Sequence, residues 1–396
     1  MRAGVSGFVP VRLTQARVSA GLTKLELGNR IGKSPSSVTR WEKGESLPES
    51  EALESLSLIL KCPIAWFTKK LPPETESNIF FRTLATTTND LRTVARVKIG
   101  WQQEIAGYFS NWLDWPEIKL PQSNAFDHRE LDRSDVANYA QNCRDMWGLG
   151  LGPIENMLLS IESAGVICSK IYQGHTKMDG LSQWEESTNR PYILLSKDKN
   201  NYYRGRFDAA HELGHLVMHR FINTFDLLHH KEIEDQANYF ASCFLLPEES
   251  LSMELPRYPS LENLLSLKRR WKVSVAAIIF RANKLGLISE DETLRLRKSY
   301  SARGWSKGEP MDDSTPPENI RLLPRAVKAL LDNNIKSKSG IVSELLLARN
   351  EIESICGLEA NFLSDLPTLD NSAYPALRKP TDTTSNVVHF KQRDRH

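Results

Sequence analysis

The sequence predicts a multidomain, mainly α-helical protein with a smaller α+β core. The chain has 396 residues, which is too long for one ordinary hydrophobic core. Apolar residues recur at helical spacing through most of the chain, whereas short runs rich in β-branched and aromatic residues gather in 165–196. We therefore expect an all-α N-terminal domain, a central domain with a small sheet, and a helical C-terminal region.

Polar segments rich in proline or glycine mark the boundaries between these parts. The clearest is KKLPPETESN, which has neither helical nor strand periodicity. A second such segment is GWSKGEPMDDSTPPEN, and the end of the chain is polar and basic. We divide the chain into a flexible leader (1–10), an N-terminal helical domain (11–68), a linker (69–78), a helical connector (79–130), the central domain (131–299), a loop or linker (300–319), a helical C-terminal region (320–376) and a disordered tail (377–396).

Capping and turn residues define the helices of the N-terminal domain. Gly21 closes a first helix, and Thr23 can cap a second. Gly32 makes the turn to a third helix, which Ser34 caps and Pro35 opens at a position where the missing N–H costs little. A fourth helix directs three leucines toward the core: Leu53, Leu56 and Leu60.

Charge within this domain is uneven, although the net charge of the whole chain is only +2. Residues 12–45 carry seven lysines and arginines against three glutamates, and the next helix adds only acidic residues. A local basic surface of this kind is typical of nucleic-acid-binding domains.

The segment LTKLELGNRIGKSPSSVTRWEKGESLP (22–48) is similar to the Cro/C1-type (XRE) helix-turn-helix, with its glycine turn and with Val38 and Trp41 at core positions. The resemblance covers about 12–68 and implies that the third helix enters the major groove of double-stranded DNA. Arg40 is the best candidate for reading a guanine. The candidate DNA-binding residues are Ser34, Pro35, Ser36, Ser37 and Arg40 near the bases, and Lys24, Lys33 and Lys43 at the phosphates.

Two departures from that family bear on specificity. Lys24 stands where the second helix often begins with glutamine, and Pro35 replaces a side chain that could hydrogen-bond a base. The alternative reading is a helical module used for dimerisation or protein contact. Because one such domain binds DNA weakly alone, we expect a homodimer on a two-fold operator. Within the basic stretch at 263–289, LKRRWKVSVAAIIFRANKLG also has a helix-turn-helix pattern, and it either touches DNA or packs on the central domain with its basic side in solvent.

The central domain places strand patterns directly before a helix that bears histidines. Strands are predicted at 165–172, 180–184 and 191–196, bounded by turn residues. The helix that follows contains RFDAAHELGHLVMH (206–219), and the next contains EIEDQANYFASCFLL (232–246).

The histidines and glutamates of these two helices have metal-ligand spacing. His211 and His215 are four residues apart, so they share a helical face and can offer two nitrogens to one ion. Glu212 lies beside that ion, where it can act as general base on a water. Glu234 supplies a third ligand, and Asn238 can hydrogen-bond a ligating histidine. The pattern predicts a Zn²⁺ site with one open position.

Other ligands are compatible with this spacing. His219 lies one turn further along the first helix, and Glu232 precedes the predicted third ligand by two residues. Cys243 is the nearest thiol, which we expect to be a small buried residue. The alternative to a metal site is a solvated helix with spare histidines, which Glu234 and Asn238 disfavour.

The motifs AHELGH and EDQANYFASCFLLP, in this order, resemble the ImmA/IrrE family of metallopeptidases over about 130–250, and the upstream MDGLSQW and RPYILL also fit. The resemblance implies a zincin-like domain in which His211, His215 and Glu234 bind zinc and Glu212 is the general base. Zinc peptidases of this kind place a strand before the active helix, and its free edge can pair with an extended substrate; we expect GLSQW or PYILLS to provide that edge. The best-understood members of the family cleave a particular repressor protein.

Together these features predict a DNA-binding transcription regulator with a zinc endopeptidase of narrow specificity, which acts in a stress or phage response. Its protein substrate would be a repressor or a segment of its own chain, within 69–78 or 304–319. The rival reading is a non-catalytic, antitoxin-like DNA-binding repressor with a structural zincin fold, which the presence of Glu212 disfavours. A general housekeeping protease would give no role to 12–68.

Cysteine usage and hydropathy indicate the compartment. The five cysteines are odd in number, scattered and without a CxxC pair, which fits a reducing environment. No apolar run approaches the length of a membrane span, and the N-terminus has no signal pattern. We expect a cytoplasmic protein without membrane contact.

Overall fold

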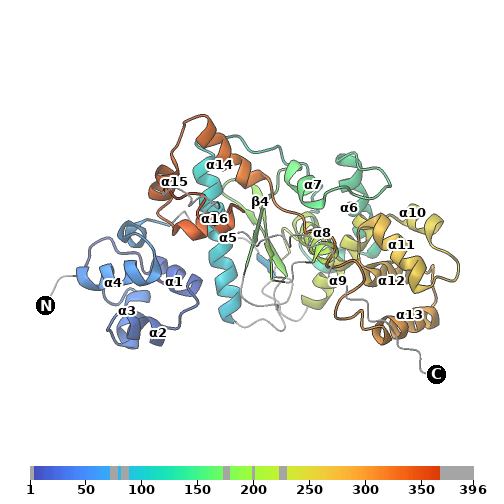
Figure 1. Cartoon of the computed structure of the whole chain (residues 1–396), viewed down its shortest axis with the longest axis horizontal. Coiled ribbons are helices and arrows are strands. Elements are labelled where there is room, and N and C mark those ends of the chain that lie inside the picture. The colour runs from blue at the N-terminus through green and yellow to red at the C-terminus, as the bar shows by residue number, and fades with distance from the viewer. Residues whose placement is uncertain are drawn as a thin grey trace, which may run out of the picture. The chain divides into compact units, whose positions relative to one another are not determined.

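The computed structural model describes residues 4–71, 79–81, 89–172, 179–198, 201–222 and 230–365. These residues form a mainly helical chain around one four-stranded sheet, which confirms the predicted fold class (Figure 1). None of the described helices combines the length and the hydrophobicity needed to cross a lipid bilayer.

The N-terminal helices lie where their caps predict. They are α1 (Pro10–Ser19), α2 (Lys24–Arg30), α3 (Pro35–Glu42) and α4 (Ser50–Leu60), followed by a 3-10 turn, Ile64–Thr68. Thr23 and Glu26 form a capping box, in which each side chain accepts the other residue's backbone N–H, at 3.1 and 2.8 Å. Ser34 caps α3 in the predicted way. Gly28 of α2 lies against the segment that leads to α3, and a Cβ there would lie 2.8 Å from the carbonyl oxygen of Lys33.

A buried ion pair joins this bundle to the long helix α5 (Asn89–Phe109). The guanidinium of Arg12, which is fully buried, donates to both carboxylate oxygens of Glu104 at 2.6 and 3.1 Å. The ring of Trp66 lies 4.1 Å from the same guanidinium and meets Trp101 edge-on at a centroid distance of 5.7 Å. The bundle and α5 therefore contribute to one continuous core.

The sheet has the strand order β1-β3-β4-β2, and its strands are β1 (Ile79–Phe81), β2 (Ile167–Ile171), β3 (Gly180–Glu185) and β4 (Arg190–Ser196). β3 pairs antiparallel with both β1 and β4, whereas β2 pairs parallel with β4. β2, β3 and β4 confirm the predicted strands. β1 lies in a segment for which we expected a helical connector, because a run of three residues carries no periodicity and its partner strand lies far along the chain.

The expectation that GLSQW or PYILLS offers a free edge is wrong. Both are inner strands, since β3 lies between β1 and β4, and β4 lies between β3 and β2. Strand order depends on contacts between distant segments, which local patterns do not encode.

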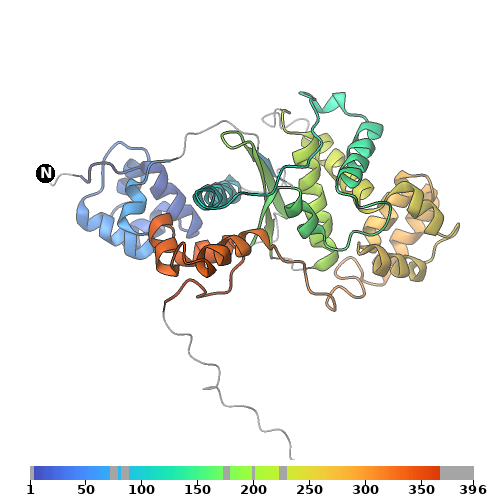
Figure 2. The ribbon, with the colours of Figure 1, turned by 90° about the horizontal axis from the view of Figure 1, so that it is seen from above.

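Alternation along the strands separates two cores. Leu181, Tyr192 and Leu194 pack with the core that includes α5, whereas Trp184 and Ile193 pack with the core that includes α8 (Tyr202–Met218). Figure 2 shows α5 on one side of the sheet and α8 on the other. The sheet is thus covered on both faces, and α8 receives a rigid support.

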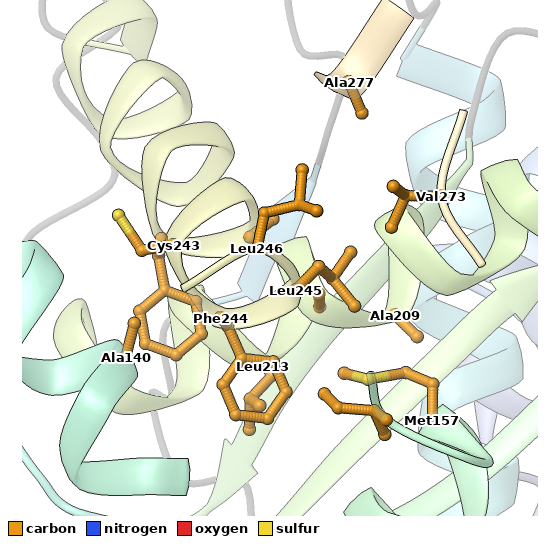
Figure 3. Packing of buried hydrophobic residues seen from close by; sticks show 14 of the residues in the cluster. Ala140, Met157, Ala209, Leu213, Cys243, Phe244, Leu245, Leu246, Val273 and Ala277 are labelled. Carbon is orange, nitrogen blue, oxygen red and sulfur yellow. The ribbon is translucent and has the colours of Figure 1, made fainter. Parts of the chain in front are cut away.

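The helices of the central domain are α6 (Arg133–Met146), α7 (Met157–Ser163), α8, α9 (His230–Leu245), α10 (Glu248–Glu254), α11 (Leu261–Trp271), α12 (Val275–Lys284) and α13 (Glu290–Ala302). Figure 3 shows their packing, with Leu213 of α8 and Phe244 of α9 close to Met157 and Ala140. Cys243 belongs to the same buried cluster, as expected.

The basic stretch at 263–289 packs on the central core. It forms α11 and α12, which bury residues such as Trp271 and Ile278. Lys268 is fully buried, and its ammonium lies 2.8 Å from Glu309 and 2.5 Å from Asp312. A buried lysine in such a pair does not face DNA, so the packing interpretation holds for this side chain.

The C-terminal helices are α14 (Leu322–Asp332), α15 (Lys338–Leu345) and α16 (Arg349–Ile355). They pack near α5 and β2, where the hydroxyl of Ser169 donates to the carbonyl oxygen of Ile355 at 2.8 Å. The loop before them is anchored to the central domain, because Glu318 pairs with buried Arg206 and accepts the N–H of Leu158 at 2.9 Å. The predicted disordered tail lies outside the described residues.

We expect Glu104→Gln to lower the free energy of unfolding by about 3–5 kcal/mol, because it leaves the charge of Arg12 buried without its counterion. Urea unfolding followed by circular dichroism measures the change. Glu54→Gln, at an exposed glutamate of α4, is the matched control and should change stability by less than about 0.5 kcal/mol. Equal stability of the two variants would contradict this prediction.

Candidate metal centre

Helices α8 and α9 hold the predicted ligands at close range. α8 starts at Asn201, whose side chain accepts the N–H of Arg204 at 2.9 Å. The two helices approach closely at Gly214, where an added Cβ would lie 3.0 Å from the ring of Phe240. The glycine of the AHELGH motif thus allows a close approach of the two helices, and a larger residue there would require the ring of Phe240 to shift.

His211, His215 and Glu234 converge. Their potential ligand atoms all lie within 4.8 Å of one another. The Nε2 atoms of His211 and His215 are 3.0 Å apart. One carboxylate oxygen of Glu234 lies 3.2 Å from His215 Nε2, and the other lies 3.4 Å from His211 Nε2. Both rings are fully buried.

The outer partners determine the tautomer of His215. The amide nitrogen of Gln236 donates to the carbonyl oxygens of His128 and Leu131 at 2.7 and 2.9 Å, so its oxygen faces His219 Nε2, at 3.1 Å. His219 therefore carries its proton on Nε2, and its Nδ1 accepts from His215 Nδ1 at 2.9 Å. Burial, reinforced by the neighbouring His215, holds the pKa of His219 well below its usual value, which keeps this ring neutral. The lone pair of His215 is thus on Nε2.

A second partner orients His211 in the same way. Asn238 Oδ1 lies 3.0 Å from His211 Nδ1, which places the proton on Nδ1 and the lone pair on Nε2.

These assignments test whether a metal ion fits the residues. Two nitrogen lone pairs and a carboxylate point at one another, an arrangement that repels unless a cation lies among them. Atoms about 2.0–2.1 Å from a tetrahedral ion lie roughly 3.3 Å apart, close to the 3.0–3.4 Å separations observed. The donor set and its spacing therefore fit a divalent ion.

Glu212 follows His211 in the chain, and a residue of the sheet hydrogen-bonds its carboxylate. It is fully buried, and one of its carboxylate oxygens accepts the hydroxyl of Ser182 in β3 at 2.7 Å. A Cβ at Gly180, also in β3, would lie 2.8 Å from its other oxygen. A larger residue at this position would require the carboxylate to move.

The alternative ligands lie elsewhere. His219 contacts Nδ1 of His215, which is not the nitrogen that faces Glu234, so His219 lies behind His215 and outside the cluster. Glu232 is exposed. Cys243 is buried in the core, where burial raises the pKa of its thiol. The geometry therefore favours Glu234 as the third ligand.

Three neighbours of the cluster were missed from the sequence. Ser182 contacts Glu212, and Gln236 contacts His219, across long stretches of sequence, so no local pattern marks them. His230 could have been found, because it precedes Glu234 by four residues on α9, and its Nε2 lies 3.8 Å from that carboxylate.

A cavity of about 670 Å³ opens beside the site. Its lining includes Asn238 and Asp208 together with the aromatic rings of Phe207, Phe280 and Trp305. It thus combines apolar surface with acidic groups within one helical turn of the ligands.

The candidate DNA-binding residues form the start of α3. Pro35 and Ser36 are exposed, and so is Arg40 one turn later. The hydroxyl of Ser34 lies 2.8 Å from that of Ser36 and 2.9 Å from that of Ser37. The surface available for base contact is therefore small and polar, with one guanidinium.

The candidate phosphate-binding lysines differ in their surroundings. Lys43 is exposed, with Glu45 at 3.6 Å, and Lys33 is half-buried. The ammonium of Lys24 lies 3.3 Å from Glu42, which also accepts two hydrogen bonds from Arg17. Glu42 therefore holds α1, α2 and α3 together.

Two known protein families match this chain, one over the candidate metal centre and one over the candidate DNA-binding residues. Residues 164–283 match the peptidase family M78, described as the IrrE N-terminal-like domain, and residues 13–67 match a family described as helix-turn-helix. The chain thus carries a helix-turn-helix match and, further along, an IrrE N-terminal-like match. Both predicted resemblances are confirmed.

A curated protein supports the same assignment. The chain is similar to the Metallopeptidase ImmA of Bacillus subtilis (strain 168), at 32% identity over 83 residues. The match covers 20% of this chain and 47% of that protein, so the chain spans about half the length of the relative it matches. The IrrE N-terminal-like domain is a metallopeptidase-family domain, which fits a divalent ion at the ligand cluster and a protein as substrate, and the helix-turn-helix domain fits DNA binding.

We expect the purified chain to hold about one divalent ion in its IrrE N-terminal-like domain, and Glu234→Ala to lose it, because a two-histidine site lacks the third ligand. Inductively coupled plasma mass spectrometry of metal-replete protein measures the content. Glu232→Ala, two residues away on the exposed side of α9, is the matched control and should keep the ion. Metal loss in both variants, or in neither, would contradict the assignment.

Proposed function

We propose that this chain is a DNA-binding regulator with zinc-dependent endopeptidase activity. One observation carries the proposal: three converging metal-ligand atoms lie beside a buried carboxylate, Glu212, that is none of the three. A purely structural metal site has no need of such a carboxylate between its two histidines. A hydrolytic site needs one, because a proton must leave the attacking water.

The donor set favours zinc. Two imidazole nitrogens and one carboxylate are the protein ligands of zinc hydrolases, which keep a fourth position open. The residues that would hold it are His211, His215 and Glu234. When bound, zinc would polarise the peptide carbonyl and lower the pKa of a water at the site.

Glu212 would move the proton during cleavage. Its carboxylate takes a proton from the attacking water and delivers it to the departing amine. Ser182 donates to one carboxylate oxygen, and Gly180 leaves the space that the other occupies. These contacts fix the direction of the carboxylate, and rigid placement of a base favours proton transfer.

The surroundings of the site favour narrow specificity. The site is buried between α8, α9 and the sheet, so a folded protein cannot enter it without presenting an extended segment. The adjoining cavity offers aromatic rings and acidic groups to a side chain of that segment. We propose a particular repressor protein, or the chain itself, as the substrate.

The helix-turn-helix domain would place this activity at a DNA site. Arg40 is exposed on α3 and would read a guanine, while Lys43 and Lys33 would contact phosphates. A homodimer would match a two-fold operator, because one copy of such a domain binds weakly. Removal of a repressor at that operator would switch transcription.

We expect Glu212→Gln to abolish cleavage of a peptide library by the zinc-loaded chain while zinc content and DNA affinity stay unchanged, because the amide cannot accept the proton. The loss should be at least about 100-fold, measured by mass spectrometry of cleaved peptides. Glu232→Gln is the matched control. Full activity of Glu212→Gln would refute the assigned base, and loss of DNA binding would show that the substitution damages the fold.

We expect Arg40→Ala to reduce discrimination at one base pair by about 1–3 kcal/mol, because a guanine loses a bidentate donor. Lys43→Ala should instead weaken binding to all sequences alike and lower the slope of log affinity against log salt by about 1. Operators selected from a random DNA library, with titrations at several salt concentrations, separate the two effects. Identical behaviour of the variants would contradict the division into base and phosphate contacts.

A further inference from the structure

The strand β3 lies along the proposed active site. Its Ser182 donates to Glu212, its Gly180 leaves space for the same carboxylate, and the indole nitrogen of Trp184 donates to the carbonyl oxygen of Leu216 in α8 at 2.9 Å. β3 is thus fastened to α8 along its length. A peptide added to its outer edge would run beside the metal ligands, which is how an extended substrate adds to a sheet.

That edge of β3 carries a segment of the chain itself. Ile79 pairs with Gln183, Phe80 with Ser182, and Phe81 with Leu181, all in antiparallel register. Opposite Cα atoms in such a pair are about 4.5–5.5 Å apart. The backbone of Phe80 therefore lies directly across from the residue that holds Glu212.

We infer that Ile79–Phe81 occupies the edge of β3 on which an extended peptide substrate would add as an antiparallel strand. The inference rests on the proposed peptidase function. The chain's own strand is then an internal competitor, and a substrate must displace it before cleavage.

The length of β1 makes displacement feasible. It pairs through three residues, fewer than the five or six of an average strand. Since it is part of the same chain, its effective concentration at β3 is on the order of millimolar, so a weak pairing is enough to keep the edge occupied. Release of β1 would therefore raise the affinity for a peptide without any new contact.

The first test uses two adjacent proline substitutions in the full chain, both in a Glu212→Gln background that prevents cleavage. In an antiparallel pair, neighbouring residues turn their N–H groups to opposite sides. One of Ile79→Pro and Phe80→Pro thus removes a donor to β3, and the other removes an outward donor and serves as the matched control. The probe is a fluorescent peptide of residues 75–85, TESNIFFRTLA, followed by anisotropy.

We expect one of the two variants to bind the peptide at least tenfold more tightly than the parent, and a peptide that carries the same proline to bind weakly. Amide hydrogen exchange of 181–183 should rise in that variant and fall again when the peptide is added. If neither variant binds more tightly than the parent, the inference is overturned.

A second test does not depend on proline. Ile79→Cys with Gln183→Cys places two thiols at a paired position, where a disulfide can form. The oxidised form should bind the peptide at least tenfold more weakly than the same protein after reduction. Equal binding by the two forms would also overturn the inference.

The two proposals fail separately. Tighter binding of the peptide, together with no cleavage of the peptide library by the zinc-loaded protein that keeps Glu212, would leave the strand position intact and refute the peptidase function. Cleavage of the peptide with no effect of the prolines or of the disulfide would support the peptidase and refute the internal competitor.

Discussion

The site depends on one electrostatic constraint: two nitrogen lone pairs and a carboxylate must lie together in the protein interior. The Nε2 atoms of His211 and His215 face Glu234, and burial removes the water that would otherwise screen them. The two imidazole rings therefore need hydrogen bonds on their other nitrogens to keep this orientation. Asn238 fixes one ring, and a chain through a third histidine to Gln236 fixes the other, ending on two backbone carbonyls. Each of these hydrogen bonds sets both the orientation of a histidine ring and the nitrogen that carries its proton.

Buried ion pairs attach peripheral segments to this centre. The loop before α14 has the composition of a linker, yet Glu318 pairs with Arg206 in the first turns of α8. In the same loop, Glu309 accepts Lys268 at 2.8 Å and the N–H of Val275 at the start of α12, also at 2.8 Å. Breaking a buried pair of this kind leaves an uncompensated charge, which is costly. These contacts therefore attach the loop to the domain that carries the ligands.

Local patterns predicted what local physics determines. The caps at Thr23 and Ser34 and the spacing of His211 and His215 follow from neighbours within one helical turn, and the structure has these elements where they were expected. The contact of Ser182 with Glu212 and the strand order depend on segments far apart in the chain, so no periodicity announces them. Composition also misleads in the loop 300–319, because acidic residues that serve as buried counterions look the same as solvated ones.

The position of β1 in the chain gives the internal strand its significance. It lies between the last turn of the N-terminal bundle and α5, so the segment that joins the helix-turn-helix region to the central domain contains the strand that pairs with β3. The ion pair of Arg12 with Glu104 attaches the N-terminal bundle to α5. We expect a change that loosens this ion pair to weaken the three-residue pairing of β1 before it affects the well-packed helices α8 and α9. A shift of the bundle would therefore reach the proposed active site first through the strand that occupies it, with the ligands themselves left in place.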